Sequence, residues 1–159
     1  MLLSELLAPE AVNPRLKADN KRDAVAELVE LLESAHGLDT RGEILDRVLR
    51  REAMMSTGIG NGVAIPHGKA RAVDRMMAAC AVSPAGVEFE AVDSEPASLF
   101  ILLVSPESLG TPHVKVLANI SRLLKEESVR KILREARTAA EFVAAIKAAE
   151  AKYLATTST

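Results

Sequence analysis

Three histidines are the side chains of this 159-residue chain that are best suited to chemistry. His67 stands between Pro66, whose ring fixes a backbone angle, and Gly68, which leaves space beside the imidazole. It directly follows a short apolar segment, so it would sit at the rigid end of a strand, a position that suits a nucleophile. Taken alone, an ordinary hydrogen-bonded loop histidine explains this position at least as well, and the neighbouring residues must decide.

The other two histidines lie at the ends of expected helices. His113 follows Thr111-Pro112, a pair typical of a helix start, where the positive end of the helix dipole favours the neutral ring. A neutral imidazole can accept one hydrogen bond and donate another. His36 ends a helix beside Gly37, and we expect it to be a surface residue rather than a ligand.

Residues upstream of His67 offer groups that bind anions. A glycine-rich loop carries Ser56, Thr57 and Gly58, and successive exposed N–H groups in such a loop form a nest for anionic oxygens. Arg51 precedes the loop, and its guanidinium matches the geometry of phosphate. Two neutral histidines, an arginine and a backbone nest together suggest handling of a phosphoryl group, with histidine as its carrier.

Nucleotide and metal sites fit the sequence poorly. The glycines at 58–62 lie between a helix and a strand, the reverse of the order that a dinucleotide fingerprint needs. The segment Gly62–Lys69 has one residue too many for a P-loop, and Ala70 stands where Ser or Thr must hold magnesium. Two histidines could ligate zinc, but no third and fourth ligands follow at a recognisable spacing.

Composition excludes several classes of partner. Twenty Lys and Arg against 22 Asp and Glu give a net charge of -2, which argues against a duplex-DNA binder. Only 3% of residues are aromatic, too few for a platform that stacks single-stranded bases. No apolar run approaches the roughly 20 residues of a spanning helix, and the N-terminus does not resemble a signal peptide. The lone Cys80 cannot form an intrachain disulfide, so we expect a cytoplasmic protein without nucleic-acid partners.

Helical patterns flank a central group of strands. The expected helices cover 20–35, 40–52 (opened by a capping box at Thr40), 113–125 (N-capped by Thr111), 128–137, and a last one from a capping box at Thr138. The expected strands cover 12–16, 63–65, 76–82 and 99–104, with a loop over 54–62. This order predicts a single α/β domain with a small mixed sheet covered by helices.

The residues around His67 resemble a known family. Arg51-Glu52, the segment Ser56–Lys69 (STGIGNGVAIPHGK) and His113 are similar to the enzyme IIA domain of the fructose/mannitol type, part of the bacterial phosphoenolpyruvate-dependent phosphotransferase system. The resemblance implies a mixed, about five-stranded sheet with helices on both faces, a domain over 1–153 and a frayed tail over 154–159. It implies phosphorylation of His67, with His113 and Arg51 as further catalytic residues. Neither a metal nor a nucleotide cofactor is implied.

The resemblance also implies partners. The expected donor is an HPr-like phosphocarrier, and the glycine-rich loop is most similar to the nitrogen-regulatory type. That type acts through phosphorylation-dependent binding of target proteins. The alternative is a sugar-transport enzyme IIA that passes phosphate to a fructose or mannitol IIB domain. A binding module without chemistry is a third possibility, which the presence of both histidines and Arg51 disfavours.

Overall fold

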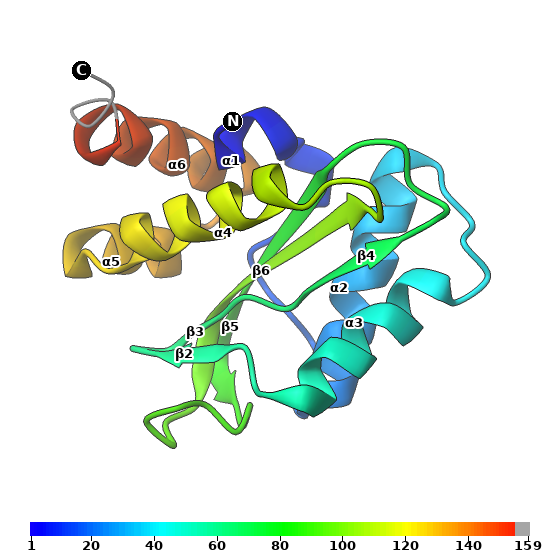
Figure 1. The fold of residues 1–159 in the computed structure, drawn as a ribbon. Coiled ribbons are helices and arrows are strands. Elements are labelled where there is room, and N and C mark those ends of the chain that lie inside the picture. Colours follow the sequence, from blue (N-terminus) through cyan, green and yellow to red (C-terminus); the bar gives the residue numbers. More distant parts are fainter. Residues whose placement is uncertain (155–159) are drawn as a thin grey trace.

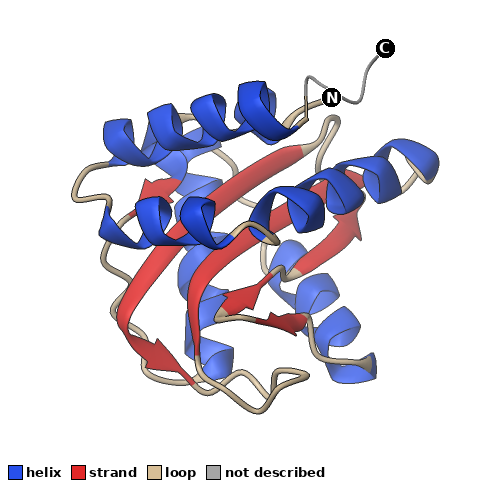
Figure 2. Ribbon diagram, turned by 90° about the vertical axis from the view of Figure 1, so that its left-hand side faces the viewer, coloured by secondary structure: helices blue, strands red, loops and turns tan. Residues whose placement is uncertain are grey.

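A mixed β-sheet lies between two layers of helices in the computed structural model, which describes residues 1–154 (Figures 1 and 2). The elements are, in chain order, α1 (Leu3–Leu6), η1 (Pro9–Ala11), β1 (Val12–Asn13), α2 (Lys21–His36), α3 (Glu43–Met54), β2 (Gly58–Gly60), β3 (Val63–Ala64), β4 (His67–Ala70), β5 (Met77–Val87), β6 (Ala97–Pro106), α4 (Thr111–Leu124), α5 (Glu127–Glu135) and α6 (Ala139–Tyr153). Helices α2 and α3 cover one face of the sheet, and α4, α5 and α6 cover the other (Figure 1). The expected fold class is confirmed.

The sheet is built around β6. Its order is β1-β5-β6-β3-β2, and β4 also pairs with β6, which makes six strands in the described part of the chain where about five were expected. β5 runs antiparallel to β6, whereas β3 and β4 run parallel to it. Both long strands carry continuous apolar runs, as expected of strands that helices bury on both sides.

Strands β3 and β4 form one interrupted strand. Val63 pairs with Leu99 and His67 pairs with Leu103, so both segments keep the same register along β6. The strand expected over 63–65 does end before Pro66, but its resumption at His67 was not expected. Proline cannot donate to the ladder, but its carbonyl accepts the Leu103 N–H at 3.1 Å, and the strand resumes at His67.

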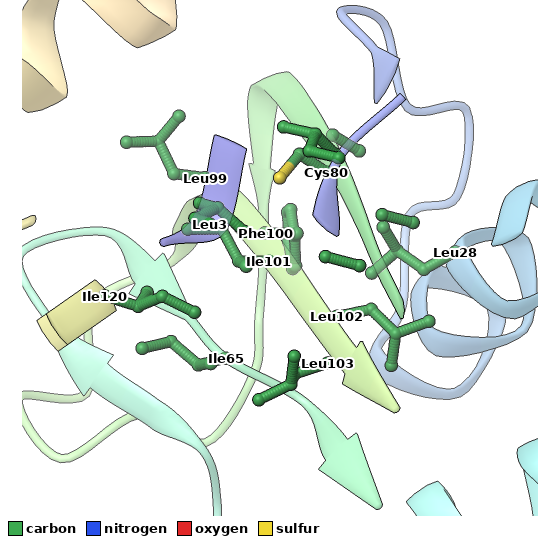
Figure 3. Close-up of a cluster of buried hydrophobic side chains, with 14 of the residues drawn as sticks. Leu3, Leu28, Ile65, Cys80, Leu99, Phe100, Ile101, Leu102, Leu103 and Ile120 are labelled. Atoms are coloured by element: carbon green, nitrogen blue, oxygen red, sulfur yellow. The ribbon is translucent and has the colours of Figure 1, made fainter. Parts of the chain in front are cut away.

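The core lies on both faces of β6. Side chains alternate along a strand, so Leu102 points toward Leu28 of α2, while Leu103 lies on the side of Ile65 and Ile120 of α4 (Figure 3). All five are buried. This alternation continues to Ser105, which shares the α4 side with Leu103.

The helix ends agree only in part with the sequence expectations. Asn20 caps α2 by accepting the Asp23 N–H at 2.9 Å, and Thr138 caps α6 by accepting the Glu141 N–H at 3.1 Å. The capping box expected at Thr40 is not formed. Helix α3 begins at Glu43, and its carboxylate accepts the N–H groups of Arg71 and Ala72 instead.

Two further boundaries differ from expectation. Thr111 is the first residue of α4 rather than its cap, which is Gly110. The expected frayed tail from 154 falls largely on 155–159, outside the described residues, but Leu154 is buried and its N–H donates to the Glu150 carbonyl at 2.9 Å. None of the helices within residues 1–154 has the length and apolar character to cross a membrane.

Candidate active site

His67 presents one ring nitrogen to a pocket and uses the other to hold its position. It is the first residue of β4, at an edge of the sheet, and is half-buried. Its Nδ1 lies 2.8 Å from the Ile65 carbonyl oxygen. A carbonyl can only accept, so in the neutral ring the proton is on Nδ1 and Nε2 carries the free lone pair. Nε2 is therefore the ring nitrogen that is free to act as a nucleophile.

His113 faces His67 from the first turn of α4. The two ring centroids are 5.5 Å apart, with the ring planes inclined at 54°. The His113 side chain is buried, and its Nδ1 lies 2.5 Å from the hydroxyl oxygen of Ser105 in β6. The structure thus brings together two residues 46 positions apart in sequence, as the sequence analysis required.

A close contact between β4 and α3 brings arginines to the same place. A Cβ atom on Gly68 would lie 3.2 Å from both Cγ2 and the backbone N of Val48, so only glycine fits without displacing α3. Arg47 and Arg51 are one turn apart on that helix. Gly68 therefore sets the distance between the arginine-bearing helix and His67.

These elements surround a cavity of about 400 Å³. Its lining residues are Arg47, Arg50, Arg51, Met54, His67, Gly68, Lys69 and His113. Among residues 1–154 its lining includes four cations and two imidazoles but no carboxylate, so the cavity suits an anion. Arg51 is oriented by donating to the Met55 carbonyl at 2.8 Å, and Arg47 by an ion pair with Glu107 at 3.0 Å.

Both rings are kept neutral by their surroundings. Burial is the first cause that lowers the pKa of His113 to about 4, and repulsion from His67 when it is protonated and from Lys69 acts in the same direction. Burial also lowers the pKa of His67, with the Arg51 charge acting in the same direction; the hydrogen bond to Ile65 and the Glu52 carboxylate oppose it. The lowered pKa of His113 agrees with the neutral ring expected from the helix dipole, although its first cause is burial.

Ser56, Thr57 and Gly58 are not among the described residues that line this cavity, and Ser56 lines a separate pocket with Glu52 and Glu90. Glu52 Oε1 accepts the Thr57 N–H at 2.9 Å, and Oε2 accepts the Thr57 hydroxyl. Ser56 Oγ accepts the Gly58 N–H at 3.1 Å and donates to the Phe89 carbonyl at 2.8 Å. These donors are engaged within the protein, so their role in phosphate binding stays a prediction.

Several residues of the site were missed by the sequence analysis. Arg47 and Arg50 could have been found from helical spacing, since Arg47 is one turn from Arg51 and Arg50 one turn from Met54. Lys69 lies two residues from His67 and so shares its side of β4. Met54 also lines the cavity, and at 81% exposure it does not pack in the core.

His36 lies apart from this cavity. It ends α2 and lines a separate pocket with Glu5 and Arg75. Within residues 1–154 no group of three or more His, Cys, Asp or Glu side chains is arranged to hold a metal ion.

Comparisons with known proteins agree on one family. Residues 5–149 match the family model described as phosphoenolpyruvate-dependent sugar phosphotransferase system, EIIA 2. A nitrogen regulatory protein of Bradyrhizobium diazoefficiens is 37% identical over 139 residues, which cover 87% of this chain and 90% of that protein. The fructose-specific EIIABC component of Bacillus subtilis is 35% identical over 136 residues, 86% of this chain but 21% of that protein. The crystal structure of nitrogen regulatory protein IIA-Ntr from Neisseria meningitidis superposes with a TM-score of 0.83 at 29% identity, covering 90% of this chain and 97% of that one.

Proposed function

The chain belongs to the EIIA 2 family of the phosphoenolpyruvate-dependent sugar phosphotransferase system, and we propose that it carries a phosphoryl group on Nε2 of His67, received from an HPr-type phosphocarrier. One observation carries the proposal. The Ile65 carbonyl holds the proton of His67 on Nδ1, which leaves the Nε2 lone pair free beside a cation-lined cavity. We further propose a regulatory output of the nitrogen type.

The proposed reaction exchanges one N–P bond for another. The Nε2 lone pair attacks phosphorus in line with the phosphohistidine nitrogen of the donor, so the new N–P bond forms as the donor's N–P bond breaks. The donor's nitrogen keeps the electron pair. Since His67 attacks as a neutral ring, its Nδ1 proton stays on the hydrogen bond to Ile65 and no base is required.

Positive groups of the cavity support this transfer. In a loose phosphoryl-transfer transition state, charge is spread over the three equatorial oxygens, and catalysis is mainly positioning and charge stabilisation. Arg51 and Lys69 supply charge at the cavity, and His113 supplies a neutral ring 5.5 Å from His67. Ser56, Thr57 and Gly58 remain proposed phosphate contacts, reached through rearrangement of their internal hydrogen bonds.

Replacing Arg51 by glutamine is expected to raise the pKa of His67. The folded-state pKa is now held below its usual value, partly by the Arg51 charge, so removing that charge favours the imidazolium. Only the neutral ring attacks phosphorus. When the pH is lowered, the phosphorylation rate of the variant will therefore begin to fall at a higher pH than the rate of the wild type. An NMR titration of His67 measures the shift, with Arg50→Gln as control because Arg50 lines the cavity but does not contribute to the His67 pKa. An unchanged His67 midpoint in Arg51→Gln would contradict this account.

The nitrogen-type output is supported by the relatives. The nitrogen regulatory protein of Bradyrhizobium diazoefficiens is 37% identical over 87% of this chain, and IIA-Ntr from Neisseria meningitidis shares its fold with a TM-score of 0.83. In this account a phosphoryl group on His67 adds negative charge at a surface where Met54 and Met55 are exposed, and target binding changes as a result. The alternative function is sugar transport through a IIB domain.

Labelling tests the carrier function. The protein is incubated with phosphoenolpyruvate, enzyme I and an HPr-type carrier, and we expect acid-labile, alkali-stable phosphate on the wild type. A wild-type protein that takes up no phosphate from a competent carrier would overturn the proposal. The phosphorylated protein is then offered fructose or mannitol IIB: retained label supports the regulatory output, and rapid loss of label supports sugar transport.

A further inference from the structure

We propose that Ser105 is a positioning residue that fixes the tautomer of His113, so that His113 presents an N–H, rather than a lone pair, to the phosphoryl group on His67. This inference rests on the proposed function. Ser105 lies in β6 and does not reach the cavity lining, so it acts only through His113. The observation behind it is the hydrogen bond of 2.5 Å between Ser105 Oγ and His113 Nδ1.

Ser105 occupies the last inward position on one side of β6. Side chains alternate along the strand, so Ser105 lies on the same side as Leu103, the side that faces α4. The earlier residues on this side, Leu99 and Ile101, are apolar and buried. The first turn of α4 brings His113 against this position. Ser105 is fully buried, so its hydroxyl can satisfy its proton only inside the protein.

Hydrogen-bond satisfaction selects the direction of this bond. Within residues 1–154 the recorded partner of the Ser105 hydroxyl is His113 Nδ1. If Nδ1–H donated to Oγ, the buried hydroxyl proton would have no acceptor, and an unsatisfied buried donor is costly. If the hydroxyl donates to Nδ1, both buried atoms are satisfied. The neutral ring then carries its proton on Nε2, the nitrogen left free to face the cavity.

The two histidines are thus held in opposite tautomers by two different partners. The Ile65 carbonyl can only accept, which leaves His67 with a lone pair on Nε2. The Ser105 hydroxyl can donate, which leaves His113 with a proton on Nε2. One ring is prepared to attack phosphorus, and the other is prepared to donate a hydrogen bond to a phosphoryl oxygen without itself carrying a charge.

Nitrogen-15 NMR of the imidazole rings tests the assignment in the wild-type protein. At neutral pH we expect His113 to be protonated on Nε2 and His67 on Nδ1. A His113 ring protonated on Nδ1 would overturn the proposal. This measurement requires no phosphoryl donor, so it decides the tautomer even if the protein proves not to be phosphorylated.

Two variants of Ser105 test the consequence for transfer. In Ser105→Ala we expect His113 to become a mixture of tautomers and the rate constant of His67 phosphorylation to fall about tenfold, the effect of losing one oriented hydrogen bond. The KM for the carrier should not change, and the loss should be smaller than in His113→Ala. Ser105→Thr keeps the hydroxyl and should restore both the tautomer and the rate.

The outcomes separate positioning from a structural role. If Ser105 only supports packing, Ser105→Ala will lower the melting temperature while the tautomer of His113 and the rate stay as in wild type, and the proposal fails. If the tautomer changes and the rate does not, His113 does not donate to the phosphoryl group and the proposal also fails. If no protein is phosphorylated, the wild type included, the result contradicts the proposed function rather than the role of Ser105.

Discussion

His67→Asn is expected to abolish phosphorylation while leaving the protein folded. Asparagine places an amide N–H near the position of Nδ1, so the hydrogen bond to the Ile65 carbonyl can be kept, but it has no counterpart of the Nε2 lone pair. With the nucleophile removed, phosphate uptake should fall by at least about 1,000-fold. His67 is half-buried at a sheet edge, so the free energy of unfolding should change by no more than about 1 kcal/mol.

His36→Asn is the matched control for this experiment. His36 ends α2 and lines a different pocket, so the same substitution there should leave labelling at the wild-type level. Labelling is measured with phosphoenolpyruvate, enzyme I and the carrier, and folding by urea denaturation of both variants. Residual acid-labile phosphate on His67→Asn at the wild-type rate would place the acceptor elsewhere in the chain.

Glu52→Gln is expected to destabilise the protein by about 2 kcal/mol, through groups that hold the loop before β2. The buried Glu52 carboxylate accepts the backbone N–H and the hydroxyl of Thr57, and it pairs with Lys21 Nζ at 2.9 Å. An amide can accept through one oxygen only and carries no charge. The variant therefore leaves one Thr57 donor without its acceptor, and the Lys21 ammonium, which is only one-fifth exposed, keeps only the exposed Glu90 carboxylate at 3.5 Å.

Glu90→Gln separates this effect from the loss of any charge near Lys21. Glu90 also contacts Lys21, at 3.5 Å, but its side chain is 78% exposed, so its replacement should cost no more than about 0.5 kcal/mol. Urea denaturation of the two variants measures the difference between their free energies of unfolding, and we expect the dependence of this free energy on urea concentration to be the same in both. Equal midpoints would show that the Glu52 network does not stabilise the fold.

The candidate site residues could be predicted from the sequence because their types are rare and their surroundings specific. A histidine between proline and glycine, a second histidine at a helix start and an arginine before a glycine-rich loop are visible without coordinates, and the structure places all three around one cavity. Their distances were not predictable. They depend on the pairing of β4 with β6 and on the contact between Gly68 and Val48, both of which join segments far apart in the chain.

The errors have the same origin. Pro66 does interrupt a strand, as its missing N–H dictates locally, but the resumption of the strand at His67 depends on pairing with β6, which lies far away in the sequence. Thr40 and Glu43 have the spacing of a capping box, but the Glu43 carboxylate accepts hydrogen bonds from the backbone N–H groups of residues 71 and 72 instead. Ser105 follows an apolar segment that is typical of any buried strand, so nothing in the sequence near it predicts a contact with His113. That contact depends on the packing of α4 against β6.

Strand β6 holds both imidazole rings in place, so the stability of this strand determines when the site unfolds. His67 is bonded to the strand through its pairing with Leu103, and His113 through the hydroxyl of Ser105. Both anchors lie on the innermost strand of the sheet, so the order of both rings depends on that strand. The Leu103 amide, which donates to Pro66 across the strand break, should therefore exchange with deuterated solvent only through global unfolding, far more slowly than the Val92 amide in the exposed connection to β6.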